Sequence, residues 1–255
     1  MNRIFAFTRR NIIELLRDPL GYIFCLGFPL IMLIIMTLVD QSIPKEAVTV
    51  FHIENLAPGV AVFGQMFVML FTALNVSTDR SGTFLMRLYA TPMTAADLTA
   101  GYIIPMLIIA EIQTVITLAA AFVISVIIGS TLSIGGMILC MLTLIPSALM
   151  FIGIGLIFGV LLNEKTAPGL CSVVISIGSF FGGIWFDAQR TGGVMLTISK
   201  CTPFFYCTRS ARSAMVLSFT GESFVLPLLI VVMCAVFMIA LGCLSFSKKM
   251  RADLG

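Results

Sequence analysis

Few residues in this sequence belong to the types that perform catalysis, and their spacing does not gather them into a site. The single histidine, His52, lies in a polar segment after the first long apolar run. An intramembrane Ser/His hydrolase needs its histidine at membrane depth beside a serine. The seven cysteines are scattered, with no CxxC or Cys/His cluster of the kind that binds a metal. We therefore expect no catalytic residue and no metal site on this chain.

The nearest approach to a nucleotide-binding motif is GVLLNEKT, from Gly159 to Thr166. A P-loop has the pattern GxxxxGK[ST] and follows a strand. Here Glu164 stands where the second glycine is needed, and the segment ends a long apolar run. We interpret it as a chance likeness. The chain is therefore expected to bind no cofactor, and any ATP-hydrolysing subunit must be a separate chain.

Glu111 is the ionisable residue that lies well inside an apolar run. It is nine residues into that run, which is about 13 Å deep at a rise of about 1.5 Å per residue. A bare charge there costs several kcal/mol, so the carboxyl must be paired, protonated, or turned toward protein or a cavity. Glu111 could line a dimer interface or a substrate path. Alternatively, it could make a structural hydrogen bond between helices of one subunit.

Composition places these residues in a membrane protein. The chain has 255 residues, of which 59% are hydrophobic and 11% are charged. Soluble domains carry roughly 25% charged residues, and a soluble chain this apolar would expose patches that aggregate. The net charge of +3 gives no case for a nucleic-acid partner.

A transmembrane helix needs about 20 apolar residues, and six stretches qualify. The first lacks a small-residue cleavage site after it, so we do not expect a cleaved signal peptide. We predict a single all-α integral membrane domain over residues 1–255 with six transmembrane helices: about Leu20–Val39, Gly59–Val76, Tyr102–Gly129, Ser133–Leu162, Ala167–Phe186 and Phe224–Phe246.

Lysine and arginine are distributed unevenly between the connecting segments. With a cytoplasmic N-terminus, ten of them fall on the cytoplasmic side and five on the other. Because positive residues favour the cytoplasmic side, we expect both termini in the cytoplasm. A multi-pass protein of the cell (inner, cytoplasmic) membrane is the resulting prediction.

Residues 1–18 form an amphipathic pattern rather than a span. Charged residues that include Arg10 and Glu14 fall on one helical face, and apolar residues that include Phe5 and Leu16 fall on the other. This favours a helix lying along the inner membrane surface, although a solvated extension is the alternative. Asp18 and Pro19 would end it and begin the next helix.

Residues 187–222 form the longest segment outside the predicted spans. The stretch MLTISKCTPFFYCTRSARSAM mixes aromatic residues with arginines, which suits short helices that dip into the outer leaflet. Cys201 and Cys207 could form a disulfide on this side. If both lie on one helix, their spacing is too large for one.

The stretch DRSGTFLMRLYATPMT, from Asp79 to Thr94, joins two predicted spans and is called the elbow below. Phe84 and Leu88 lie at i and i+4, which indicates a short helix with one apolar side. Pro92 ends that helix, and Thr94 with Asp97 forms a capping box for the next one. Such an elbow could bind a partner protein, or could lie on the membrane surface.

The sequence resembles the permease subunits of type-2 ABC exporters. The resemblance rests on Asp79-Arg80, Gly82-Thr83, Arg87-Leu88 and Thr91-Pro92 between spans two and three. It also includes RRNIIELLRDPLGYI near the N-terminus, GIGLIFGVLLNEKTAPGL between spans four and five, and GGIWFD leading to CTPFFYCTRSARSAM. It covers the whole chain through the order and spacing of these motifs.

The resemblance implies that the elbow, within a cytoplasmic loop of residues 77–101, is a coupling helix that docks into a separate ATPase subunit. Two copies of that ATPase, binding ATP and Mg²⁺, would serve two permease subunits, identical or paralogous, surrounded by membrane lipid. The implied contact residues are Asp79, Arg80, Gly82, Thr83, Phe84, Arg87, Leu88, Tyr89, Thr91 and Pro92.

The same resemblance implies a translocation path lined by spans two and five. On span two it points to Phe67, Phe71 and Asn75, and the residues that share one face of span five are Ser172, Ser176, Ser179 and Phe180. The serines could instead bond their own helix backbone. Uncharged aromatic and hydroxyl groups would suit a hydrophobic drug, antibiotic, peptide or lipid-like molecule. A stand-alone secondary transporter or channel is the alternative function.

Overall fold

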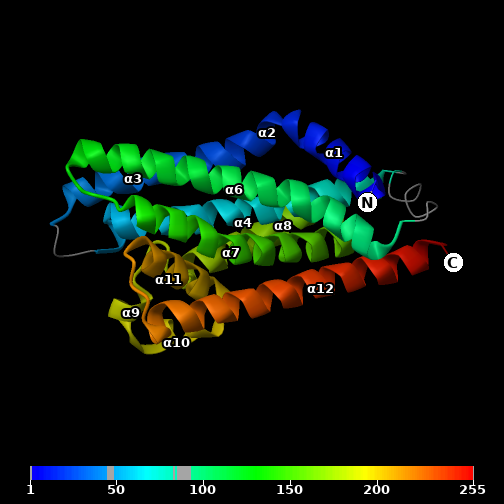
Figure 1. The fold of residues 1–255 in the computed structure, drawn as a ribbon. Coiled ribbons are helices and arrows are strands. Elements are labelled where there is room, and N and C mark those ends of the chain that lie inside the picture. Colours follow the sequence, from blue (N-terminus) through cyan, green and yellow to red (C-terminus); the bar gives the residue numbers. More distant parts are fainter. Residues whose placement is uncertain (1, 45–48, 83, 85–92, 255) are drawn as a thin grey trace.

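The computed structural model describes residues 2–44, 49–82, 84 and 93–254, and every regular element in these ranges is a helix (Figure 1). The prediction of an all-α fold is therefore confirmed for the described residues. The elements are α1 Asn2–Leu16, α2 Pro19–Tyr22, the π-helix η1 Ile23–Gly27, α3 Phe28–Ser42, the 3₁₀ helix η2 Thr49–Phe51, α4 Ile53–Ser81, α6 Ala95–Ile128, α7 Ile134–Leu161, α8 Ala167–Phe181, α9 Ala188–Thr191, α10 Gly193–Cys201, α11 Pro203–Met215, the π-helix η3 Gly221–Val225 and α12 Leu226–Leu254.

Five helical stretches among the described residues are long and apolar enough to cross a membrane. They are Ile23–Ser42, Ile53–Ser81, Ala95–Ile128, Ile134–Leu161 and Gly221–Lys249. The predicted fifth span, Ala167–Phe186, is represented by α8, which has only 15 residues. Its helix ends early because the chain turns at Gly182 and Gly183, and Gly183 has a φ of 71° that favours glycine. The count of six spans stays a prediction.

Helices α4 and α7 form the centre of the bundle. In the most apolar part of α4, 78% of the residues are buried inside the chain, against 17% in the C-terminal helical stretch. Gly155 and Gly159 of α7 allow the two central helices to approach closely. A Cβ atom on Gly155 would lie 2.5 Å from the carbonyl oxygen of Met69, and one on Gly159 would lie 2.6 Å from the Cβ of Val76. This glycine spacing therefore serves packing within one chain.

Helix α1 packs against α6, with Phe7 and Asn11 buried, while Phe5 and Leu16 are exposed. The predicted break at Asp18-Pro19 is confirmed, because α2 begins at Pro19. Arg10 departs from the expected solvated face and turns inward, because a buried carboxylate lies beneath it, as described below.

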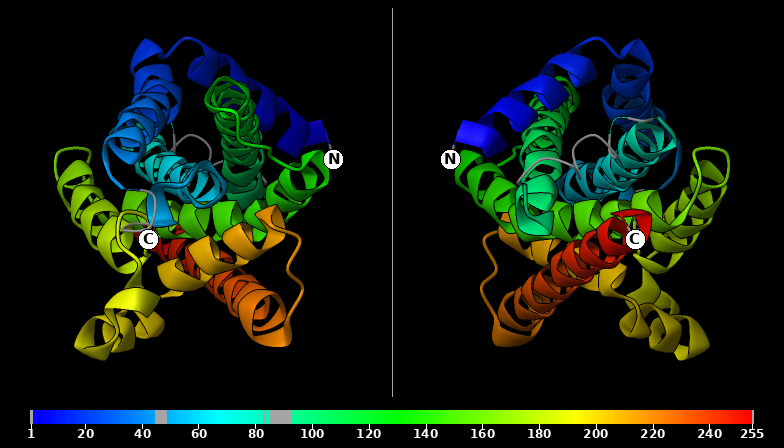
Figure 2. Two further views of the ribbon diagram at one scale, coloured as in Figure 1. Left: turned by 90° about the vertical axis from the view of Figure 1, so that its left-hand side faces the viewer. Right: turned by 90° about the vertical axis from the view of Figure 1, so that its right-hand side faces the viewer.

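The two ends of the bundle differ in structure. Both termini lie at one end, and α9, α10 and α11 lie at the other (Figure 1). Figure 2 shows α9 and α10, in yellow, projecting from the side of the bundle. Helix α11 packs on α4, α7 and α12, and Arg212 fixes it by donating to the carbonyl oxygens of Asn55 at 3.0 Å and Ile184 at 3.3 Å. Cys201 and Cys207 are both free, and Cys207 is buried.

Candidate functional site

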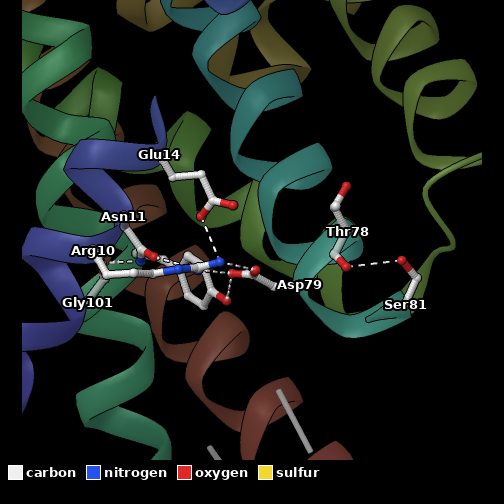
Figure 3. A network of polar contacts seen from close by, with 8 residues as sticks. Arg10, Asn11, Glu14, Thr78, Asp79, Ser81 and Gly101 are labelled. Atoms are coloured by element: carbon white, nitrogen blue, oxygen red, sulfur yellow. Dashed lines mark hydrogen bonds and ion pairs between the residues drawn. The ribbon is translucent and has the colours of Figure 1, made fainter. Parts of the chain in front are cut away.

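The elbow begins at a buried polar network that joins three helices. Asp79, in the last turn of α4, is only 6% exposed. The Arg10 guanidinium of α1 donates to both carboxylate oxygens of Asp79, at 2.7 and 2.8 Å (Figure 3). The Tyr102 hydroxyl of α6 donates to the same carboxylate at 2.7 Å. We call Arg10, Asp79 and Tyr102 the polar knot.

Glu14 and Asn11 extend the knot along α1. Arg10 forms an ion pair of 2.8 Å with Glu14, and Asn11 donates to the carbonyl oxygen of Gly101 in α6 at 3.0 Å. Burial lowers the pKa of Arg10, but the hydrogen bond and charge of Asp79 outweigh this effect and raise it. Partial burial raises the pKa of Glu14, and Arg10 opposes that shift only in part. The bidentate geometry orients α1 rigidly on α4.

Phe84 packs onto the knot from the elbow side. Its ring lies 4.0 Å from the guanidinium carbon of Arg10 and 6.3 Å, centroid to centroid, from the ring of Phe7. Phe7 in turn contacts the ring of Tyr102 edge-on at 5.0 Å. Phe84 was expected to face a partner subunit, but its ring is partly buried within this chain, because α1 lies beside it.

Arg80 and Ser81 tie the elbow to the turn between α7 and α8. Arg80 donates to the carbonyl oxygen of Val160, near the C-terminus of α7, and to Asn163 Oδ1 at 3.1 Å. Ser81 donates to Glu164 Oε2 at 3.0 Å. Carbonyl groups in the last turn of a helix lack intrahelical donors, so Arg80 acts as a cap for α7. Asp79 and Arg80 therefore fix α4 to neighbours on two different sides.

The helix α4 continues through Ser81, and Gly82 ends it in an extended conformation. Of the other expected contact residues, Thr83, Arg87, Leu88, Tyr89, Thr91 and Pro92 lie outside the described residues. At the far side of the elbow the predicted capping box is confirmed. Thr94 Oγ1 accepts from the Asp97 N–H at 3.2 Å, and Asp97 Oδ2 accepts from the Thr94 N–H at 2.9 Å. Both ends of the elbow are thus fixed by side-chain contacts.

A cavity of about 620 Å³ lies on one side of α4, between α8 and the stretch that begins with η1. We call it the aromatic cavity. It brings together five of the residues expected on a translocation path: Phe67, Phe71, Ser172, Ser176 and Ser179. Its wall is formed by Asp18, Phe24, Phe28, Met32, Phe63, Phe67, Leu70, Phe71, Leu74, Ser172, Ile175, Ser176, Ser179 and Trp185.

The three serines use their hydroxyl groups along α8. Ser172 donates to the carbonyl oxygen of Pro168 at 2.8 Å, and Ser176 donates to that of Ser172 at 2.8 Å. Ser179 donates to that of Ser176 at 2.9 Å. The interpretation that the serines bond their own helix is therefore confirmed, although they still form part of the wall. Phe180 lies outside the wall and stacks on Phe186 at 5.3 Å.

Asn75 lines a second cavity, of about 240 Å³, that adjoins the first. The two cavities share Asp18, Phe71 and Leu74. The second also reaches Glu14 and Asp79. The aromatic cavity and the polar knot are therefore neighbours, although one is built from spans and the other from the base of the elbow.

Glu111 is not part of the wall of either cavity. Its Oε1 atom is buried without a hydrogen-bond partner among the described residues. The nearby Gln113 is fully buried and donates to Thr117 Oγ1 at 3.0 Å. A role for Glu111 in a substrate path stays a prediction.

Sequence reasoning did not foresee Asp18, Tyr102 or Trp185 as members of these sites. Asp18 was interpreted only as a helix cap, and Trp185 only as part of a motif. The i, i+4 spacing of Phe63, Phe67 and Phe71, matched by Phe24 and Phe28, was the available signal for an aromatic wall. No local pattern could place Asp18 beside them.

The sequence matches the ABC-2 type transporter family over residues 2–216. A search of curated proteins found no match. The family match includes the polar knot, the elbow and the whole wall of the aromatic cavity. It agrees with the apolar helices and with the order of motifs along the chain. The chain therefore belongs to the ABC-2 type transporter family and is a multi-pass membrane permease of an ABC transporter.

Proposed function

We propose that this permease is half of the membrane portion of an ATP-driven exporter. Two permease subunits, identical or paralogous, would enclose the translocation path, and two separate ATPase subunits would bind ATP and Mg²⁺. The observation that carries this proposal is the attachment of the elbow. Asp79 fixes its base to α1 and α6, and Arg80 fixes it to the turn between α7 and α8.

These attachments supply a route for mechanical coupling. A force on the elbow acts on the end of α4 through the peptide chain, and the knot carries it to α1 and α6. The contacts of Arg80 and Ser81 carry it toward α8. Because α4 and α8 both contribute to the wall of the aromatic cavity, a displacement of the elbow would change the shape of that cavity. Rigid elements with discrete arrangements transmit such changes.

The contact with the ATPase is assigned to the apolar residues of the elbow. Leu88 and Tyr89 would enter a groove on the ATPase, with Arg87 at its rim. Phe84 would contribute less than its size suggests, because its ring already packs on Arg10 and Phe7. Thr91 and Pro92 would keep the elbow rigid, since proline fixes one backbone angle.

In the proposed topology α8 is the fifth of six crossings, in addition to the five longer helical stretches. Fifteen residues span about 22 Å, which is less than the hydrocarbon thickness of about 30 Å. The turn at Gly182 to Phe186 would complete the crossing. Both termini and the elbow would face the cytoplasm, α1 would lie at the inner membrane surface, and α9 to α11 would re-enter the outer leaflet. The substrate would be a hydrophobic drug, antibiotic, peptide or lipid-like molecule.

The coupling proposal is tested by purifying the tagged permease with its ATPase from native membranes. Leu88→Ala and Tyr89→Ala should each reduce recovery of the ATPase about tenfold or more, because buried anchors contribute most of an interface. Arg87→Ala should reduce it much less. As a matched control, Leu142→Ala removes an exposed leucine from the side of α7 and should have no effect. Equal recovery from all four variants would contradict docking through the elbow.

A further inference from the structure

Six of the fourteen residues in the wall of the aromatic cavity carry an aromatic ring. Phe67 lies at its centre, with ring centroids 5.3 Å from Phe28, 5.2 Å from Phe63 and 6.5 Å from Phe24. Phe63 extends the group to Trp185 at 5.2 Å. Phe71 completes the set on the next turn of α4. The volume of about 620 Å³ is in the range of cavities that hold drug-sized molecules.

Asp18 is the charged side chain in that wall. It lies between α1 and α2, and it also lines the adjoining smaller cavity. The adjoining cavity adds two further carboxylates, Glu14 and Asp79. Arg10 is the cation that contacts both of these, and it does not line either cavity. Asp18, Glu14 and Asp79 thus bring three carboxylates to the walls of the two adjoining cavities.

Aromatic faces and a carboxylate recognise the same kind of ligand. The face of an aromatic ring attracts a cation and not an anion. A carboxylate at the edge of an apolar cavity adds an attraction for positive charge that is stronger than it would be in water. A neutral apolar molecule would gain from burial alone, and an anion would be repelled by both features.

We propose that the aromatic cavity binds lipophilic organic cations, with the apolar body against the rings of Phe63, Phe67 and Trp185 and the positive charge directed toward Asp18. The inference rests on the proposed exporter function, because it names the substrate class of the cavity whose wall contains five of the residues expected on the translocation path. It narrows a broad set of hydrophobic substrates to those that carry a positive charge.

The chain provides its own reporter for this binding. Trp185 is the only tryptophan in the sequence and lies in the cavity wall. Its fluorescence can be titrated with tetraphenylphosphonium and with tetraphenylborate, which have nearly the same shape and opposite charge. In the purified full-length protein, tetraphenylphosphonium should change the Trp185 emission at about tenfold lower concentration than tetraphenylborate does. Equal affinities, or tighter binding of the borate, would overturn the proposal.

Single substitutions test whether the preference for tetraphenylphosphonium over tetraphenylborate comes from residues of the aromatic cavity. Asp18→Asn should weaken tetraphenylphosphonium binding about tenfold and should not weaken tetraphenylborate binding, whereas Asp18→Glu should retain most of the preference. Glu222→Gln is the matched control, because it removes one exposed negative charge in η3, away from the cavity. Each ion also partitions into the detergent, but to the same extent for every variant. The change in affinity of one ion between two variants is therefore independent of this partitioning.

Asp18 precedes α2, so its substitution could prevent folding. Phe67→Leu then serves as a second variant, because it keeps an apolar side chain and removes the central ring. It should weaken phosphonium binding severalfold more than borate binding. If Phe67→Leu, or a folded Asp18→Asn, binds both ions as the wild type does, the assignment is wrong.

This titration needs no ATPase, so its outcome is separable from the exporter proposal. A permease that binds tetraphenylphosphonium selectively and yet fails to recover an ATPase would contradict the proposed function and not this inference. A permease that couples to its ATPase and shows no preference between the two ions would contradict this inference alone.

Discussion

At the scale of single residues, the carboxylate of Asp79 is a buried charge that needs partners within the chain. Burying a charge costs several kcal/mol unless it is paired and hydrogen-bonded. Asp79 receives two hydrogen bonds from Arg10 and one from Tyr102. These three bonds stabilise the buried charge, and each comes from a helix other than α4. Asp79 therefore adds a polar attachment to α1, which also packs against α6.

Removing the cation of the knot should destabilise the protein strongly. Arg10→Met leaves Asp79 buried without its guanidinium, which should cost about 2–3 kcal/mol of folding free energy. Arg9→Met is the matched control, because Arg9 is the adjacent arginine and is exposed, so its loss should change stability by less than about 0.5 kcal/mol. Thermal unfolding in detergent measures both. Equal melting temperatures for the two variants would contradict a stabilising knot.

The sequence identified Asp79 and Arg80 as candidate functional residues, but it could not reveal which residues they contact. The family resemblance assigned both residues to the contact with an ATPase and named no partner for either of them within this chain. Instead Asp79 contacts a residue 69 positions earlier, and Arg80 contacts residues about 80 positions later. These partners depend on how whole helices pack, and helix packing is not a local property of the sequence.

At the scale of elements, the contact between α4 and α7 depends on small residues. Gly155→Ala would place a Cβ 2.5 Å from the carbonyl oxygen of Met69 and 2.7 Å from the Cβ of Thr72. The backbone of α4 cannot move away without disturbing the core, so we expect a loss of about 1–3 kcal/mol.

Gly169→Ala in α8 is the control for helix propensity. Apart from its chain neighbours and the backbone of its own helix, no atom lies within 4 Å of its added Cβ, and alanine favours a helix over glycine by about 1 kcal/mol. This variant should be neutral or slightly more stable. Measured in the same detergent, the melting temperature of Gly155→Ala should fall below that of the wild type, and the melting temperature of Gly169→Ala should not. A Gly155→Ala protein as stable as Gly169→Ala would show that α7 does not pack on α4 through these glycines.

Helix boundaries were predictable where local signals are strong. The capping box at Thr94 and Asp97 and the start of α2 at Pro19 followed from side-chain chemistry within three residues. The end of α8 was not predictable in the same way, because Ile184 to Phe186 continue the apolar composition after the turn at Gly183. The inward face of α1 was also missed, because Arg10 has the same sequence pattern whether it faces water or Asp79.

At the scale of the whole molecule, the two ends of the bundle should face opposite sides of the membrane. The end that holds both termini also holds the base of the elbow, and the other end holds α9 to α11 (Figure 1). Arginines and lysines are more frequent in the segments assigned to the termini end, which favours the cytoplasm for that end.

Cysteine labelling checks this orientation. In a cysteine-free background, Arg190→Cys, at the end of α9, should react with an impermeant thiol reagent added outside intact cells. Lys249→Cys, near the end of α12, should react only after the membrane is opened. The reversed pattern would place the elbow outside the cell, where it could not meet an ATPase.

The central claim is that ATP hydrolysis by a separate subunit drives export through motion of the elbow. Uptake of labelled lipophilic compounds into inside-out vesicles, measured together with ATP hydrolysis, tests this most directly. Wild-type vesicles should accumulate compound only when ATP is supplied. Replacing Thr91-Pro92 with Gly-Gly should preserve much of the hydrolysis and abolish most of the uptake, because a flexible elbow cannot transmit force. Uptake driven by an ion gradient without ATP, or unchanged ATP-driven uptake by the Gly-Gly variant, would contradict the account.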